Sequence, residues 1–169
     1  MKLHIGGETK KEGWKILNIQ PGLYVDFIGD LRDLSQFDDN SVEEVYASHV
    51  LEHIGQAYVN KALKDIFRII KKGGKFYVSV PDLDVLCRMF VHEKASKKIK
   101  FDVMRIIFGG QTDKYDYHYF GWNFEFLNEF LIEAGFSKIE KVENFGLFKD
   151  TSELKCYGNY ISLNIIAIK

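Results

Sequence analysis

The sequence feature that most constrains the fold is an amphipathic segment, residues 56–72, that lies between two strand-like runs. Apolar residues recur in this segment at the spacing of one buried helical face: Val59, Ala62, Leu63, Ile66, Phe67 and Ile70. Two lysines and two glycines at residues 71–74 predict the end of the helix, with the glycines as its left-handed cap. Strand-like runs precede it at residues 42–48 and follow it at 75–80. Such a unit crosses over in the right-handed sense, so the two strands are predicted to be parallel.

The rest of the chain predicts five more strands and three more helices. The predicted strands are residues 2–5, 14–19, 24–28, 138–144 and 160–168, and the predicted helices are residues 82–92, 97–108 and 123–134. Asn123 is a suitable N-cap, and Gly135–Phe136 fits a Schellman ending. No repeat or linker divides the chain. We therefore expect residues 1–169 to form one domain, an α/β fold around a mostly parallel sheet.

Composition and charge exclude several classes of protein. The chain of 169 residues has 23 Lys and Arg against 24 Asp and Glu, and its net charge of -1 argues against nucleic-acid binding. No apolar run approaches the roughly 20 residues that span a bilayer, and residues 1–7 lack the apolar stretch of a signal peptide. The two cysteines, Cys87 and Cys156, cannot form a disulfide framework, so a cytoplasmic location is expected.

A parallel sheet places its ligand at the carboxyl ends of the strands, so the residues at those positions are the first site candidates. They are Gly6–Gly7, Asn18, Asp30, Ser48–His49 and Pro81–Asp82. The sequence contains no G-x-G-x-x-G fingerprint and no P-loop. A ligand at this edge should therefore be one whose binding does not depend on a pyrophosphate at a helix N-terminus.

Several short motifs follow one another in an order that is more specific than any one of them. Together they resemble the class I S-adenosylmethionine (SAM)-dependent methyltransferases, most closely a small bacterial group usually described only as predicted methyltransferases. The resemblance covers nearly the whole chain and rests on these segments: 3–7, 13–14, 21–22, 25–26, 29–31, 46–53, 72–74, 78–82, 108–111, 131–136 and 161–164. It implies SAM as the cofactor and S-adenosylhomocysteine (SAH) as the product. It also implies a Rossmann-like fold, with a seven-stranded, mostly parallel sheet, an antiparallel last strand and helices on both faces.

The resemblance implies cofactor-binding roles for three residues of the first two strand ends. Gly6 and Gly7 would form the loop beneath the methionine part of the cofactor, where a side chain would block close approach. Asn18 would lie at the ribose, where the family usually has an acidic residue that binds both hydroxyl groups. An amide keeps only part of that interaction, so we expect binding to be weaker by roughly 1–1.5 kcal/mol.

Further along the chain, Asp30 and Leu31 would contact adenine, while Ser48 and His49 would lie beside the transferred methyl group. Two other departures separate this chain from the family pattern. The usual G-x-G is shortened to two glycines, and only about nine residues separate the first two strands, so the first core helix is expected to be missing. These departures leave open a second hypothesis, in which the chain binds SAM or SAH but has weak or lost catalysis.

Methyl transfer from a sulfonium requires an acceptor in line with the methyl group, and a base where the acceptor is protonated. Four side chains are candidates for that base: His49, His53, Asp82 and His118. His118 belongs to the aromatic segment 115–120, which could cover the cofactor or line the acceptor site, and a purely structural role suits it equally well. The near-neutral charge and the short chain favour a small-molecule or sugar-like acceptor, with no nucleic acid and no membrane span.

A third, remote hypothesis comes from residues 49–53, which spell the H-x-x-E-H motif of inverted zinc peptidases. On a helix, His49 and His53 would share one face as metal ligands, with Glu52 as the base. Against a zinc hydrolase, residues 43–48 have the pattern of a strand that ends where the motif begins, and no third ligand is evident. We therefore expect no metal site. A polar network at the entry to the next helix accounts equally well for Glu52 and His53.

Overall fold

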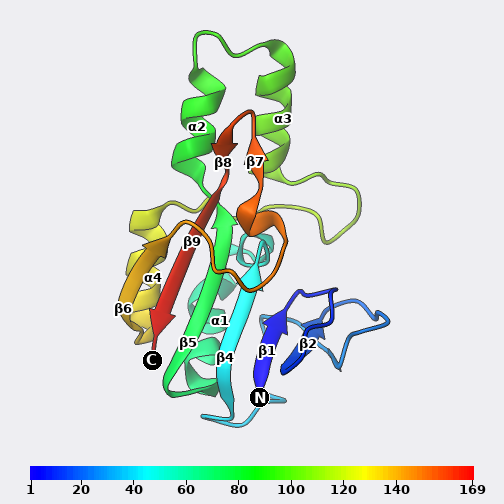
Figure 1. Ribbon diagram of the computed structural model, residues 1–169, viewed down its shortest axis with the longest axis vertical. Helices are drawn as coiled ribbons and strands as arrows, with labels where there is room; N and C mark the ends of the chain where they lie inside the picture. The colour runs from blue at the N-terminus through cyan, green and yellow to red at the C-terminus, as the bar shows by residue number, and fades with distance from the viewer.

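In the computed structural model, which describes residues 1–169, seven strands form one sheet in the order β3-β2-β1-β4-β5-β9-β6 (Figure 1). All neighbours from β3 to β5 are parallel, and β9 is antiparallel to both β5 and β6. The strands are β1 (Lys2–Ile5), β2 (Trp14–Asn18), β3 (Phe27–Ile28), β4 (Val42–Ser48), β5 (Ile70–Pro81), β6 (Ser137–Val142) and β9 (Ser162–Ile168). The predicted mixed sheet with an antiparallel last strand is therefore confirmed.

Four α-helices and several short elements complete the chain. They are α1 (Gln56–Ile69), α2 (Leu83–Val91), α3 (Lys97–Phe108), α4 (Phe124–Ala134), the 3-10 turns η1 (Leu51–His53) and η2 (Thr151–Glu153), and the hairpin strands β7 (Lys155–Cys156) and β8 (Asn159–Tyr160). The predicted caps of α4 are confirmed. Asn123 Oδ1 accepts the Phe126 N–H at 3.0 Å, and the Phe136 N–H donates to the Leu131 carbonyl at 3.0 Å after a left-handed Gly135.

The strand residues alternate between two faces of the sheet, and the larger core covers one of them. Val45 and Ala47 of β4 and Val78 of β5 belong to a cluster of 28 buried residues that includes the apolar residues of α1 and α4. Figure 1 shows both helices behind the sheet in this view. The amphipathic pattern of α1 therefore identified its buried side, with Val59, Ala62, Leu63, Ile66 and Ile69 all in contact with the core.

The opposite face of the sheet carries a smaller aromatic core instead of a helix. Trp14, Tyr46, Tyr77 and Phe148 form this cluster. Phe148 comes from the loop after β6, which crosses in front of β9 and β5 in Figure 1. On this part of the sheet a loop takes the place of the missing first core helix, because the short connections between the first strands leave no residues for a helix.

The connection between α1 and β5 differs from the prediction. The helix ends at Ile69, and Ile70 already has extended dihedral angles, so Gly73 and Gly74 are part of β5 and do not cap α1. Gly73 does have a positive φ of 78°, as predicted for a left-handed position. Its N–H donates to the carbonyl of Lys169 at 2.9 Å, so the turn secures the end of β9. Lysines and glycines at this spacing occur both after helices and at strand bends. The sequence near Gly73 does not distinguish the two, because the hydrogen-bond partner of Gly73 is Lys169, nearly one hundred positions away.

The predicted loss of the first core helix is confirmed, since only turns connect β1 to β2. The third strand is shorter than the predicted residues 24–28 and is limited to Phe27–Ile28. Asp26 nevertheless continues the edge pairing, because its N–H donates to the Ile16 carbonyl at 2.9 Å and its carboxylate accepts the Ile16 N–H at 2.9 Å. The amino-terminal part of the sheet is therefore a set of short strands joined by loops.

Helices α2 and α3 form a pair that projects beyond the carboxyl end of the sheet (Figure 1). They pack around a small separate cluster that contains Leu86, Met89, Val103 and Ile161. No helix of the protein is both long enough and apolar enough to cross a membrane.

Candidate active site

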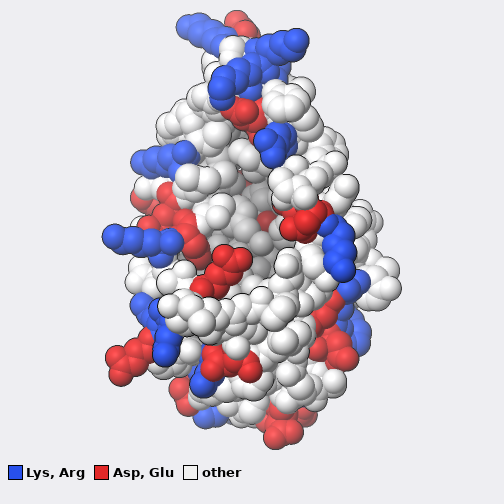
Figure 2. Space-filling model, turned by 90° about the vertical axis from the view of Figure 1, so that its right-hand side faces the viewer, with Lys and Arg blue, Asp and Glu red and all other residues white.

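The main candidate site is a cavity of about 490 Å³ at the carboxyl ends of β1, β2 and β4. Viewed from the side of β1 and β2, the surface has a hollow with acidic side chains at its rim (Figure 2). Residues that follow the first four strands line the cavity, together with the loop segment 113–119. This is the edge at which a parallel sheet binds ligands, and the volume is in the ordinary range for small-molecule sites.

Gly6 lines the cavity, whereas its neighbour Gly7 does not. Gly6 has a φ of 75°, and a Cβ atom built on it would lie 2.5 Å from Val50 Cγ2. A Cβ atom on Gly7 would lie 2.5 Å from Nδ1 of His4. Packing inside the protein therefore requires both glycines, in addition to the predicted need for a close approach by the cofactor.

Asn18 lies at the end of β2 and lines the cavity, but its amide is already used within the protein. Its Nδ2 donates to the Gly7 carbonyl at 3.1 Å, and its Oδ1 accepts the Gln20 N–H at 3.0 Å. A carboxylate could not make the first of these bonds. The amide at this position therefore connects the shortened glycine loop to the second strand.

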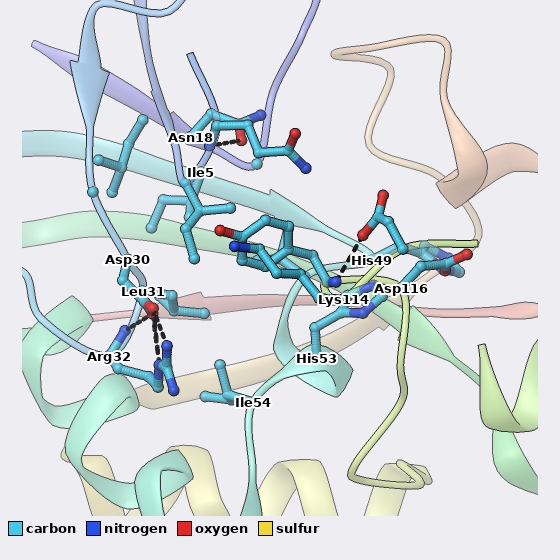
Figure 3. A pocket seen from close by; sticks show the side chains of 18 of the residues that line it. Ile5, Asn18, Asp30, Leu31, Arg32, His49, His53, Ile54, Lys114 and Asp116 are labelled. Atoms are coloured by element: carbon cyan, nitrogen blue, oxygen red, sulfur yellow. Dashed lines mark hydrogen bonds and ion pairs between the residues drawn. The ribbon is translucent and has the colours of Figure 1, made fainter. Parts of the chain in front are cut away.

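Asp30 and Leu31 line the same cavity from the loop after β3 (Figure 3). The carboxylate of Asp30 accepts hydrogen bonds from the backbone N–H of Arg32, at 2.8 Å, and from its guanidinium. Burial opposes ionisation of this carboxyl, but the bonds from Arg32 hold its pKa below the ordinary value. Asp30 is therefore a fixed negative charge beside the cavity.

His49 lines the cavity in a left-handed conformation, with φ at 53°, directly after β4. The Ser162 hydroxyl donates to the Thr151 carbonyl at 2.8 Å, so it accepts a hydrogen bond from Nε2 of His49, also at 2.8 Å. The other ring nitrogen, Nδ1, lies 3.3 Å from a carboxylate oxygen of Glu52. The ring of His49 is therefore held between Ser162 and Glu52.

Two other predicted site residues lie outside the cavity. Ser48 is partly buried at the end of β4, and its hydroxyl has no hydrogen-bond partner. Asp82 is buried as the N-cap of α2, where Oδ1 accepts the N–H groups of Asp84 and Val85 at 3.1 and 3.3 Å. Lys141 also contacts the Asp82 carboxylate at 3.3 Å. Asp82 therefore caps α2 and pairs with Lys141, and its carboxylate does not line the cavity in which a base would act.

His53 lines the cavity, and His118 lies against it with the two ring centroids 4.7 Å apart. Burial lowers the pKa of His118 below its ordinary value, because a charged imidazole would lose hydration. The buried Glu52 side chain completes the group, and one of its carboxylate oxygens and one ring nitrogen of each imidazole all lie within 4.8 Å of one another. The structure thus brings together two predicted bases that are far apart in the sequence.

The same arrangement corrects two expectations about the H-x-x-E-H motif. The motif does not lie on a helix: η1 has only three residues, and His49 precedes it with a left-handed backbone. His49 and His53 therefore cannot form the ligand pair of an inverted zinc peptidase on one helical face. However, a third possible metal ligand does exist, because His118 lies beside His53.

Several residues of the cavity were not predicted from the sequence. They include three acidic residues and one lysine, Glu8, Asp113, Asp116 and Lys114. Asp116 shapes its own loop, since its carboxylate accepts the N–H groups of Gly110 and Thr112 at 3.3 and 3.1 Å. The segment 109–122, which carries Asp113, Lys114 and Asp116, has no helical or strand periodicity, so no regular sequence pattern places these residues at the cavity.

A second cavity of about 570 Å³ lies between α2, the start of α3 and the β7–β8 hairpin. It is slightly larger, but the ionisable side chains that line it include Arg88, His92 and Lys94 and no carboxylate. It also lies away from the carboxyl edge of the first strands. Charge and position therefore favour the cavity at the sheet edge for a cationic ligand.

The chain is also similar to known proteins. Residues 9–78 match the family model of a methyltransferase domain. No curated protein sequence matches the chain.

Solved structures extend the similarity to the whole fold. A SAM-dependent methyltransferase of Archaeoglobus fulgidus aligns with a TM-score of 0.62 and 16% identity, over 99% of this chain and 85% of that one. A Thermotoga maritima SAM-dependent methyltransferase aligns with a TM-score of 0.59 and 20% identity, over 99% and 81%. A Haemonchus contortus phosphoethanolamine N-methyltransferase, solved with SAM, aligns with a TM-score of 0.57 and 16% identity, over 100% and 49%.

The sequence motifs, the strand order and the comparisons therefore all indicate a methyltransferase fold. The narrower resemblance to a bacterial group stays a prediction. Residues 9–78 match a methyltransferase domain, and the chain as a whole has the fold of the class I SAM-dependent methyltransferases.

Proposed function

We propose that the protein transfers a methyl group from SAM to a small-molecule acceptor in the cavity at the sheet edge. The observation that carries the proposal is the cavity itself, which lies at the carboxyl ends of β1, β2 and β4 in a methyltransferase fold. Five of the seven residues predicted to bind the cofactor line it: Gly6, Asn18, Asp30, Leu31 and His49.

The charge of the cavity supports a cationic cofactor. Four carboxylates line it, from Glu8, Asp30, Asp113 and Asp116, against two cations, from Arg32 and Lys114, so the formal charge of the lining is about minus two. When bound, SAM supplies a positively charged sulfonium with an activated methyl group. A surplus of fixed negative charge at this edge favours such a ligand over a phosphate-bearing one.

The positions of the side chains divide the cavity into two ends. Asn18, Asp30 and Leu31 lie toward the outer strands, where we place the adenosine part of the cofactor (Figure 3). His49 and His53 lie at the end next to β4, where we place the acceptor. His53 is the imidazole that would orient and activate the acceptor, because Ser162 and Glu52 already lie against both ring nitrogens of His49.

A titration of the protein with SAM and with SAH in a calorimeter tests cofactor binding. We expect both to bind, and ligand at one hundred times its dissociation constant to stabilise the fold by about 2.7 kcal/mol. Absence of heat and of any thermal shift with either compound at millimolar concentration would overturn the proposal.

Methyl transfer is tested separately, because a chain that only binds SAM is the second hypothesis. The bonds of Asn18 to its own loop favour this alternative, since they leave the amide less free for the ribose. SAM labelled in its methyl group, incubated with panels of small alcohols, amines and sugars, should yield a labelled product together with SAH. Tight SAM binding without product from any panel would favour the binding module.

A further inference from the structure

Glu52 is a buried carboxylate whose charge is not compensated by hydrogen bonds. Its side chain is fully buried, and neither carboxylate oxygen has a hydrogen-bond partner. The nearest basic nitrogen is Nδ1 of His49, 3.3 Å from Oε1. A carboxylate in this situation loses its hydration without replacement, so the structure calls for a positive charge beside it.

Two imidazoles face this carboxylate from different parts of the chain. Single ligand atoms of Glu52, His53 and His118 all lie within 4.8 Å of one another. The loop that carries His118 is fixed to η1, because the Tyr119 N–H donates to the Glu52 carbonyl at 2.8 Å. The cluster is therefore a product of the fold, which joins residues more than sixty positions apart in the sequence.

The hydrogen bond of His53 suits a metal ligand. Its Nδ1 lies 3.1 Å from the Tyr117 carbonyl oxygen, so Nδ1 carries the hydrogen and donates it there. This leaves the Nε2 lone pair available. Imidazoles that bind metal ions usually donate their other N–H to a carbonyl or carboxylate in this way, which fixes the tautomer and the orientation of the ring.

We propose that Glu52, His53 and His118 bind one divalent transition-metal ion of the zinc class. Two imidazoles and one carboxylate form a ligand set that proteins use for zinc with one position left open. Ligand atoms around tetrahedral zinc lie about 3.3–3.5 Å apart, so the side chains need to close by roughly 1 Å. His53 lines the cavity, so the open position faces it and would take a water molecule or an oxygen atom of the acceptor.

Metal titration of the chelator-stripped wild-type protein tests this directly. We expect one equivalent of Co²⁺ to give the visible absorption of a tetrahedral nitrogen–oxygen site, and one equivalent of Zn²⁺ to displace it. Competition with a chromophoric chelator gives the affinity. Glu52→Gln, His53→Ala and His118→Ala should each weaken binding by at least about 100-fold, which is more than the loss of a supporting hydrogen bond costs.

His92→Ala is the matched control. His92 lies at the end of α2, where its Nδ1 accepts the Lys94 N–H at 3.2 Å, and it is not part of the cluster. We expect this variant to bind the metal ion with unchanged affinity. Equal weakening in the control and in the cluster variants would overturn the proposal.

Because a buried-site variant could unfold, a second measurement uses only the wild-type protein. In the Co²⁺ form, proton spectra should show two exchangeable, strongly shifted imidazole N–H signals, one from each ligating histidine. Failure to bind Co²⁺ or Zn²⁺ at one equivalent, or a number of shifted signals other than two, would overturn the proposal. These readouts do not depend on methyl transfer, so the metal site and the proposed function can fail separately.

Discussion

At the scale of single residues, Asp30 offers the sharpest test of the cavity. Asp30 lines it, and Asp33, three residues later, does not, although each carboxylate accepts the backbone N–H two residues on. Asn in place of either aspartate keeps that acceptor and removes the charge. We expect Asp30→Asn to weaken SAM binding about tenfold and Asp33→Asn to leave it unchanged, as measured by calorimetry. Equal affinities in the two variants would place the cofactor elsewhere.

Asn18 gives a second prediction at this scale, about stability. Asn18→Asp replaces an N–H donor with a carboxylate that faces the Gly7 carbonyl oxygen. We expect the free energy of unfolding to fall by about 1–2 kcal/mol, because a hydrogen bond is lost and two acceptors approach each other. Urea denaturation measures the change, with Asn60→Asp on the exposed face of α1 as a control near zero. A stability equal to that of the wild type would mean that the Asn18–Gly7 bond contributes nothing.

At the scale of elements, the end of α4 tests how closely α4 and α1 pack against each other. Gly135 has a φ of 109°, and a Cβ atom there would lie 2.9 Å from the ring of Phe67 in α1. Gly146 also has a positive φ, 62°, but has nothing within 4 Å. We expect Gly135→Ala to lower the unfolding free energy by about 2 kcal/mol or more, and Gly146→Ala by about 1 kcal/mol, in the same denaturation assay. An equal loss in both variants would show that backbone strain alone determines the cost.

The elements also show what the sequence could predict. The seven strands of the sheet and the four helices were predicted because their apolar residues have regular spacing, as in α1 and α4. The prediction that Gly73 and Gly74 cap α1 is wrong, because the hydrogen-bond partner of Gly73 is Lys169 at the far end of the chain. Gly6, Asn18 and Asp30 could be placed at one edge because parallel strands end together. The proximity of His118 to Glu52 depends on a loop without periodicity, so no local pattern could predict it.

At the scale of the whole molecule, one buried histidine makes stability depend on pH. His4 lies in the aromatic core of the second sheet face, against Tyr46 and Phe148, and burial lowers its pKa from 6.5 to about 4. Below pH 6.5 the unfolded chain therefore binds a proton that the folded protein does not.

Above pH 6.5 His4 is neutral in both states and should not affect the free energy of unfolding. As the pH falls from 6.5 toward 4, protonation of His4 in the unfolded chain should lower that free energy by up to about 3 kcal/mol. Unfolding free energies of the wild type and of His4→Gln, measured from pH 8 to pH 4, isolate this contribution, since other groups titrate alike in both proteins. Parallel pH profiles for the two proteins would contradict the prediction.

The central claim concerns the whole molecule, namely that the cavity at the edge of β1, β2 and β4 binds SAM. Titration of ¹⁵N-labelled protein with SAM locates the ligand directly. The account predicts that the backbone amide signals of Gly6, Asn18, Asp30 and His49 shift most. Unchanged signals at these residues, with shifts at Met89 and Tyr157 in the cavity beside α2 and the β7–β8 hairpin, or no shifts at millimolar SAM, would contradict it.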